Sequence, residues 1–150
     1  MQRTSEKNRA AGFTLVECMV ALVILAVGML GVAALYIEGL RAGRTAVFHT
    51  TAVNMAADIA DRIRSNRTAG AAYAAAAANN NCVNGVADCA PAVLAADDLF
   101  VWEQDLVTRL PGGTGNIVVV AGPPNTYTIT VSWAEAGQAA LVNYILDVQI

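Results

Sequence analysis

The stretch from Cys18 to Ile37 reads CMVALVILAVGMLGVAALYI and contains no charged residue. Its length is about the 20 residues that an α-helix needs to cross the hydrocarbon core of a bilayer. Ahead of it, residues 1–12 carry three basic side chains and one acidic side chain. Because flanking positive charge stays on the cytoplasmic side of a membrane, the sequence predicts a single-pass protein with a cytoplasmic N-terminus. The residues after Ile37 are then expected on the far side, the periplasm of a Gram-negative cell.

The composition of the whole chain limits the classes of protein that it can represent. Of the 150 residues, 56% are hydrophobic and 14% are charged, and the formal net charge is -3. A disordered tail would be poor in hydrophobic residues and rich in charge, so this class is excluded. A nucleic-acid-binding domain normally carries a basic excess, which is missing here. The sequence therefore predicts at most one globular domain besides the apolar segment.

Two ordinary explanations of the apolar segment are a secretory signal peptide and a plain membrane anchor. A signal peptide has an apolar region of about 7–15 residues followed by small residues at its cleavage site. This segment is longer, and it continues as YIEGLRAGR. A plain anchor does not account for Glu17, which lies one residue before the uncharged run. Because a carboxylate at an apolar layer is costly, Glu17 is a candidate functional residue.

Residues 11–17, AGFTLVE, follow a short basic leader and precede the long apolar run. In this combination they resemble the type III signal of type IV pilins. The resemblance implies that a prepilin peptidase cuts between Gly12 and Phe13 on the cytoplasmic side and methylates the new amine of Phe13. Cys18 stands where that family usually has an aliphatic residue, which leaves the cleavage motif intact.

Glu17 matches the glutamate that type IV pilins have five residues into the mature chain. The resemblance implies that its carboxylate pairs with the N-terminal amine of a neighbouring subunit when the chain leaves the bilayer for a filament. Such pairing neutralises a carboxylate that is otherwise unpaired in lipid. Glu17 is thus expected to be a subunit-docking residue. No residue is expected to be catalytic, and no cofactor or metal is expected.

The helix is predicted to continue beyond the membrane over residues 13–66, because no proline precedes residue 91. Its second half carries an apolar stripe at helical spacing, formed by Phe48, Ala52, Met55, Ile59 and Ile63. On the other side, Asp58 with Arg62 and Asp61 with Arg64 have the spacing of ion pairs within a helix. This half is therefore predicted to be amphipathic.

Residues 68–81 are alanine-rich and predict a helix tail or a variable loop. Cys82 and Cys89 follow, bracketing VNGVAD, whose Asn-Gly pair favours a turn. In an oxidising periplasm two cysteines this close predict a disulfide, with two free thiols as the alternative. A zinc site is not expected, since the single histidine, His49, lies on the long helix and the ligand spacing is wrong.

A second helix is predicted from Pro91 to Leu110, with a kink near Asp97. Its apolar face is formed by Leu99, Trp102, Leu106 and Leu110. Three carboxylates are expected on a solvated face rather than as acid–base or metal-ligand groups: Asp98, Glu103 and Asp105. Residues 111–115, PGGTG, lack the lysine and the helical context of a phosphate loop, so they predict the turn that ends this helix.

Three strands are predicted in the last third of the chain, over residues 116–121, 126–133 and 142–150. In the second of them apolar and polar residues alternate, which is typical of a strand buried on one face. An antiparallel sheet with one apolar face needs a cover, and the stripe of the long helix supplies one. The predicted fold is therefore α+β, with a long N-terminal helix packed on a small antiparallel sheet, as in the type IV pilin fold.

Three segments are similar to PilV-type minor pilins: AADIADRIRSNR within residues 55–67, LPGGTGNI at residues 110–117 and YTITVSW at residues 127–133. The resemblance implies a low-abundance pilin that joins other minor pilins in a complex priming type IV pilus assembly at the filament tip. Its implied partners are the prepilin peptidase, the other minor pilins and the major pilin, the inner-membrane assembly platform and, before assembly, the membrane itself. Alternatively, these segments only build the helix–sheet core and leave the subclass open.

The expected organisation has three regions. Residues 1–12 form a cytoplasmic leader that is cleaved off. Residues 13–66 form the long helix, of which 13–37 span the membrane or enter the filament core and 38–66 are amphipathic. Residues 67–150 form a periplasmic α+β head. The mature chain is expected first in the inner membrane and then in the pilus filament.

Other functions stay open as alternatives. A pseudopilin of a type II secretion system would share the N-terminal signal and the helix. A DNA-uptake or adhesion pilin is a further alternative, but only the arginines within residues 62–67 support binding of nucleic acid, which is not expected. A membrane-anchored enzyme has the least support, because the sequence offers one histidine and no nucleophile–base pair.

Overall fold

The computed structural model of the chain describes residues 12–82, 85 and 88–150. Apart from Gly12, the expected leader lies outside the described residues, as does the asparagine of the expected Asn-Gly turn at residues 84–85. Internal contacts divide the chain into two units, Met1–Gly43 and Arg44–Ile150. The first unit holds the apolar segment, and the second holds the globular part.

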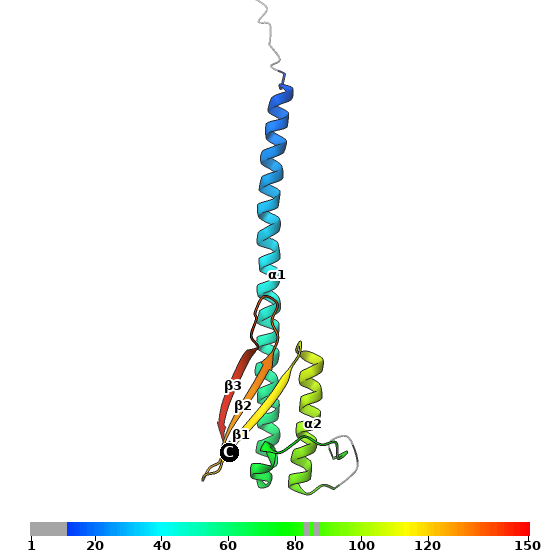
Figure 1. Cartoon of the computed structure of the whole chain (residues 1–150), viewed down its shortest axis with the longest axis vertical. Coiled ribbons are helices and arrows are strands. Elements are labelled where there is room, and N and C mark those ends of the chain that lie inside the picture. The colour runs from blue at the N-terminus through cyan, green and yellow to red at the C-terminus, as the bar shows by residue number, and fades with distance from the viewer. Residues whose placement is uncertain (1–11, 83–84, 86–87) are drawn as a thin grey trace, which may run out of the picture. The chain divides into compact units, whose positions relative to one another are not determined.

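The elements follow one another in the order α1 (Leu15–Ser65), the 3-10 helix η1 (Arg67–Ala74), α2 (Pro91–Arg109), β1 (Thr114–Val120), β2 (Thr126–Trp133) and β3 (Val142–Gln149) (Figure 1). The second unit contains the C-terminal part of α1 and all the later elements. The predicted α+β class is confirmed: the long N-terminal helix packs, through this part, on a small three-stranded antiparallel sheet. The architecture is consistent with the type IV pilin fold.

The long helix is two residues shorter at its start and one residue shorter at its end than predicted. It begins at Leu15 because Thr14 caps it, as described below. It ends at Ser65, since the backbone of Asn66 leaves the helical region with φ -120° and ψ 49°. The alanine-rich stretch at residues 68–81 was predicted to be a helix tail or a loop, and the structure shows a short helix followed by a loop. It starts as η1, which buries the side chain of Tyr73.

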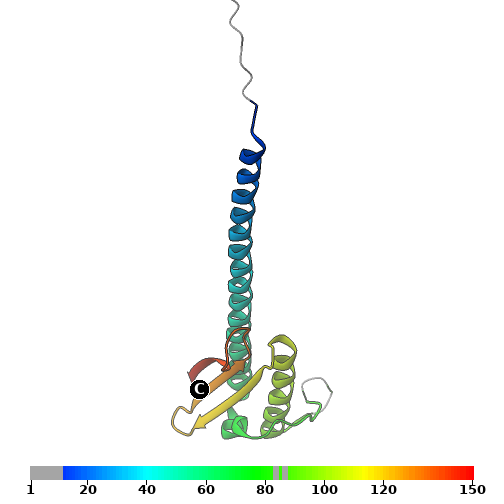
Figure 2. The same ribbon diagram turned by 45° about the horizontal axis from the view of Figure 1, so that its top comes forward.

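The sheet has the strand order β1-β2-β3, and both strand pairs are antiparallel (Figure 2). Ile129 of β2 lies opposite Ile117 on one side and Leu146 on the other. The predicted alternation of β2 is confirmed, since its apolar residues are buried: Tyr127, Ile129, Val131 and Trp133. The structure differs from the predicted strand bounds in β1, which begins at Thr114 and ends at Val120, and in β3, which ends at Gln149.

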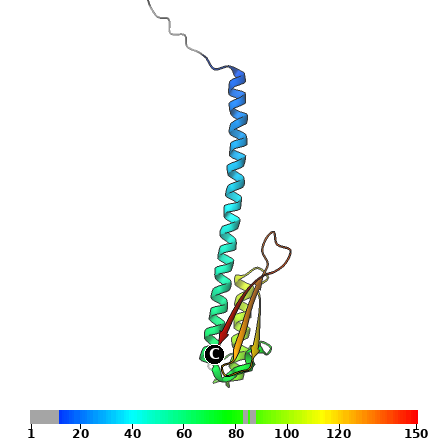
Figure 3. The same cartoon turned by 90° about the vertical axis from the view of Figure 1, so that its left-hand side faces the viewer.

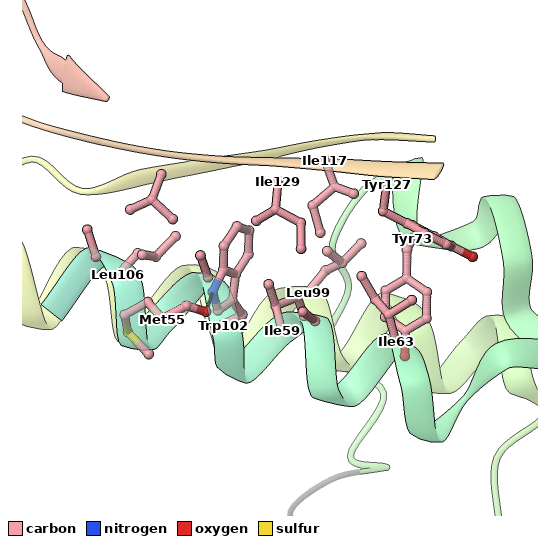
Figure 4. Packing of buried hydrophobic residues seen from close by; sticks show 14 of the residues in the cluster. Met55, Ile59, Ile63, Tyr73, Leu99, Trp102, Leu106, Ile117, Tyr127 and Ile129 are labelled. Atoms are coloured by element: carbon pink, nitrogen blue, oxygen red, sulfur yellow. Dashed lines mark hydrogen bonds between the residues drawn. The ribbon is translucent and has the colours of Figure 1, made fainter. Parts of the chain in front are cut away.

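One face of the sheet is covered by α2 and by the C-terminal part of α1 (Figure 3). The predicted stripe of α1 is confirmed, with Ala52, Met55, Ile59 and Ile63 buried and Phe48 partly buried. The apolar face of α2 is confirmed as well, because Leu99, Trp102, Leu106 and Leu110 are buried. Figure 4 shows Met55, Ile59, Leu99 and Trp102 between the two helices and the sheet, so that one hydrophobic core joins both helices to the sheet.

Two expectations for the second helix are wrong. Helix α2 runs from Pro91 to Arg109 without the predicted kink near Asp97, and it contains no internal proline or glycine that would break its hydrogen bonds. The second error concerns Asp98, which was expected on a solvated face but is only 5% exposed. Its neighbour Asp97 is 2% exposed. Both carboxylates lie inside the second unit because other elements supply hydrogen-bond donors to them.

Strand β1 contains a glycine, Gly115, at which it lies very close to the second helix. A Cβ atom added to Gly115 would lie 2.3 Å from the ring atoms Cη2 and Cζ3 of Trp102. No real Cβ atom tolerates such a distance, so a larger residue here would displace either the strand or the indole. Gly115 thus allows β1 to lie directly on Trp102.

Candidate functional site

The bond expected to be cleaved joins Gly12 to Phe13, and both residues precede α1. Both are exposed, and Phe13 is 81% exposed. Because the helix begins only at Leu15, the backbone of this bond lies outside the regular hydrogen bonding of the helix. A peptide bond that is exposed and non-helical is accessible to a protease without prior unwinding of the helix.

Thr14 forms the N-cap of α1. Its Oγ1 accepts a hydrogen bond of 3.3 Å from the backbone N–H of Glu17, and its carbonyl oxygen accepts bonds from the backbone N–H groups of Glu17 and Cys18. A threonine followed three residues later by a glutamate is the sequence of a capping box. The cap explains why the helix starts at Leu15 and leaves the Gly12–Phe13 bond outside.

Glu17 lies in the first turn of α1, where the partial positive charge of a helix N-terminus favours a carboxylate. Over the described residues 12–82, 85 and 88–150, no basic side chain lies within ion-pair distance of this carboxylate. The group is therefore available to a positive charge from elsewhere.

The apolar side chains around Glu17 have no protein cover in the first unit. Leu15, Val16, Met19 and Val20 are between 53% and 75% exposed. Among the described residues, α1 is the one helix that is long and apolar enough to cross a membrane, and its most apolar window is not buried in the structure at all. Burial of such a surface is favourable by roughly 25 cal/mol per Å², so it requires lipid or another apolar surface.

The second unit contains a buried polar network around Asp98. This carboxylate accepts a hydrogen bond of 2.8 Å from the hydroxyl of Tyr73. It also forms an ion pair with Arg62, whose Nη1 lies 3.2 Å away. Arg62 also binds Asp58 on its own helix at 3.0 Å, as predicted from the spacing. The amide of Asn66 donates to the carbonyl oxygen of Pro91 at 2.8 Å. These contacts tie the end of α1 to both η1 and α2.

The network changes the protonation properties of its members. Burial first, and then the hydrogen bond to Asp98, raises the pKa of the Tyr73 hydroxyl above its ordinary value of about 10. Burial lowers the pKa of Arg62, but the carboxylates of Asp58 and Asp98 raise it by more, so the net shift is upward. Tyr73 therefore stays neutral and Arg62 stays charged at neutral pH.

Sequence reasoning did not identify this network as a unit. The spacing predicted the pair of Asp58 and Arg62 but not the second carboxylate on Arg62, because Asp98 lies 36 residues from Arg62 along the chain. The signal that the sequence did contain was the aspartate pair at residues 97–98, which directly precedes Leu99 of the apolar face of α2. Tyr73 gave none, since the alanine-rich stretch around it predicts little structure.

Two of the arginines within residues 62–67 are already paired with carboxylates of the chain itself. Arg62 is engaged by two aspartates, and Arg64 is paired with Asp61, as the spacing predicted. These ion pairs reduce the positive charge that a nucleic-acid backbone could use.

Cys82 and Cys89 are joined by a disulfide in the structure, with their Cα atoms 5.9 Å apart. Two hydrogen bonds hold the segment before this disulfide against α2. The backbone N–H of Ala78 donates to the carbonyl oxygen of Ala96, and the backbone N–H of Asn80 donates to the side-chain carboxylate of Asp97. Cys18 is a free and exposed thiol in the apolar segment.

The described residues contain no group of three His, Cys, Asp or Glu side chains that could hold a metal ion. His49 lies edge-on to the ring of Trp133, with 5.0 Å between the ring centroids. Its role in the second unit is a packing contact.

The N-terminal signal is also what the comparison with known families finds. Residues 7–33 match the family model of the prokaryotic N-terminal methylation motif. The match spans the end of the leader, the Gly12–Phe13 bond, Glu17 and the first part of the apolar helix. It supports a type IV pilin-like protein, made as a prepilin, and such a protein is processed by a prepilin peptidase and assembled with other pilins. Comparisons with curated proteins and with solved structures found no match.

Proposed function

We propose that this chain is a PilV-type minor pilin, which joins other minor pilins in a complex that primes type IV pilus assembly at the filament tip. The observation that carries the proposal is the arrangement of residues 12–17: an exposed non-helical bond, a capped helix start and a carboxylate that forms no ion pair with any described residue. The PilV-type subclass is favoured by the similarity of residues 55–67, 110–117 and 127–133 to such pilins.

In this proposal the prepilin peptidase cuts between Gly12 and Phe13 and methylates the amine of Phe13. Methylation keeps the positive charge of an amine, so mature Phe13 carries an ammonium group. Before assembly the chain spans the inner membrane once, with its N-terminus in the cytoplasm and residues 67–150 in the periplasm. The assembly platform then moves it into the filament.

Glu17 docks the subunit in this proposal, by pairing its carboxylate with the Phe13 ammonium of a neighbouring subunit. A carboxylate at the level of the apolar segment costs a few kcal/mol in a bilayer, and an ion pair removes part of that cost. The exposed apolar side chains of α1 are buried at the same time against neighbouring helices. A shallow apolar hollow at Gly28, lined by Ile24, Leu25, Met29 and Val32, offers room for such a helix.

The proposal is tested by deleting the chain and counting surface pili. A primer of assembly is expected to leave few or no pili when it is missing, and pili should return when retraction is also disabled. Normal pilus numbers in the deletion strain would contradict priming and indicate an accessory or adhesive role. Mass spectrometry of the membrane-bound protein tests the processing step separately, since the mature chain should begin with a methylated Phe13.

A pseudopilin of a type II secretion system is the second candidate, because the N-terminal methylation motif serves type IV pilins and pseudopilins alike. The two are distinguished in the same deletion strain. Loss of protein secretion with normal pili would favour the pseudopilin, whereas loss of pili with normal secretion would favour the minor pilin.

A further inference from the structure

The sheet of the second unit ends at β3 with an unpaired edge. No strand among the described residues lies beyond β3, whose partner on the other side is β2. Asn125 and Ile150 exchange both backbone hydrogen bonds, of 3.2 and 3.0 Å, at one end of this ladder. In an antiparallel ladder, hydrogen-bonded and non-hydrogen-bonded pairs alternate. Counted from Ile150, the residues whose N–H and C=O groups point away from β2 are Asn143, Ile145, Asp147 and Gln149.

The core is also incomplete at this edge. On β2 the side chains that face the helices are 0–1% exposed. On β3 the corresponding side chains are only partly buried, although they pack against the same core: Val142, Tyr144, Leu146 and Val148. The inner face of β2 is therefore fully buried, whereas the inner face of β3, like Val119 of β1, is only partly covered.

The usual protections of a sheet edge are missing from β3. Exposed edges are commonly guarded by lysine, proline or a bulge, and β3, which reads VNYILDVQ, contains no lysine or proline. Its pairing with β2 is regular over all eight positions. Its one charged residue, Asp147, accepts a hydrogen bond of 2.6 Å from Thr128 on β2 and is thereby turned toward the sheet. The opposite side of the sheet differs, because β1 contacts η1 and α2.

We propose that the edge of β3 binds an extended strand of a neighbouring filament subunit, which adds a fourth strand to the sheet. Only an extended backbone matches donors and acceptors that repeat every second residue, a distance of roughly 7 Å. The strand needs apolar side chains at alternate positions, because these close the half-open column on the inner face of β3. That the strand comes from a filament subunit rests on the function proposed above.

The test uses two substitutions at Ile145, whose side chain is 58% exposed and whose N–H points to the open edge. Ile145→Pro removes this N–H and blocks strand addition, whereas the bonds to β2 are made by Tyr144 and Leu146 and persist. Ile145→Thr removes a similar amount of apolar surface but keeps the N–H. Both full-length variants are expressed in cells that assemble filaments, and their amounts in membranes and in sheared filaments are compared by immunoblot.

The Thr variant should enter filaments at the wild-type level, and the Pro variant should be reduced about tenfold or more, the effect of losing one or two net hydrogen bonds. Equal unfolding midpoints of the two purified full-length chains in detergent micelles show that the Pro variant is folded. Equal incorporation of both variants, or equal loss of both, would overturn strand addition. Absence of the wild-type chain from filaments would instead overturn the proposed function, and with it the source of the strand.

Amide hydrogen exchange of the full-length chain in micelles checks the geometry on which the proposal depends. The amides of Asn143, Ile145 and Asp147 should exchange rapidly, and those of Tyr144 and Leu146 should be protected. Uniform protection along β3 would show that the edge is already occupied, and it would refute the proposal.

Discussion

The indole Nε1 of Trp102 donates a hydrogen bond of 2.9 Å to the backbone carbonyl oxygen of Met55. The two residues lie on α2 and α1, 47 positions apart in the sequence, and both are buried. The bond fixes the second helix against the first at the centre of the core, where the indole also contacts the sheet at Gly115. Hydrophobic burial alone would not determine how far α2 can slide along α1, whereas this directional contact does.

Substitution of Trp102 should therefore cost more than substitution of the other tryptophan. The indole N–H of Trp133 is buried and has no hydrogen-bond partner among the described residues. We expect Trp102→Phe to lower the free energy of unfolding by about 1 kcal/mol more than Trp133→Phe, because only the first loses a hydrogen bond. Urea unfolding of the full-length chain in micelles measures both, and equal losses would contradict the role of the Met55 contact.

Gly115→Ala should destabilise the second unit by about 1–3 kcal/mol, the usual cost of overpacking a core. The added methyl group would collide with the indole of Trp102 at 2.3 Å. Gly39→Ala is the matched control, since no atom lies within 4 Å of a Cβ at this position in α1. The control should be neutral or slightly stabilising, because alanine favours a helix by up to about 1 kcal/mol over glycine. Thermal unfolding of both variants compares them directly.

The raised pKa of Tyr73 predicts a loss of stability at alkaline pH. The folded state keeps the hydroxyl protonated above pH 10, whereas the unfolded state releases its proton near pH 10. The contribution of Tyr73 is thus fully present below pH 10 and declines as the pH rises toward the folded-state pKa, by at most about 1.4 kcal/mol per pH unit. Tyr73→Phe should be less stable at pH 7 but should lack this decline. Unfolding free energies measured from pH 8 to 11 test the difference, and parallel curves would refute it.

Glu17→Ala should leave membrane insertion and leader cleavage intact and remove most of the chain from filaments. Loss of a charge-assisted pair with the Phe13 ammonium, about 1.5–3 kcal/mol, corresponds to a reduction of roughly tenfold or more. Glu38→Ala is the matched control, because Glu38 lies on the same helix and pairs with Arg41 of that helix on the surface. Immunoblots of membranes and sheared filaments give the readout. Normal incorporation of Glu17→Ala would show that the carboxylate does not dock the subunit.

Removal of the disulfide should lower the stability of the second unit. Cys82 and Cys89 close a loop with a sequence separation of 7, for which the chain-entropy model gives about 2.5 kcal/mol. Replacing both cysteines by serine should produce a loss of this order, measured as a lower unfolding midpoint. Cys18→Ser is the control and should have no effect on that midpoint. A reductant should act on the wild-type chain and leave the double serine variant unchanged.

The features that the sequence determined by itself are those with short-range patterns. The uncharged run at residues 18–37, the residues around Gly12 and Phe13, the stripe of α1 and the alternation of β2 each depend on residues that are close together in the chain. Such patterns state which face of an element is apolar. For this reason the α+β class, the single long helix and the covered sheet could be predicted.

Only the tertiary structure decided how distant residues meet. The burial of Asp98 depends on donors from Tyr73 and Arg62, 25 and 36 positions away, and no local pattern distinguishes it from a solvated carboxylate. Apolar and polar residues alternate in both β2 and β3. The inner face of β3 is nevertheless only half buried, because the helices do not extend over the whole of it. The physical reason is that a period in the sequence fixes the direction of a side chain relative to its own backbone, whereas its partner is fixed by the packing of the whole unit.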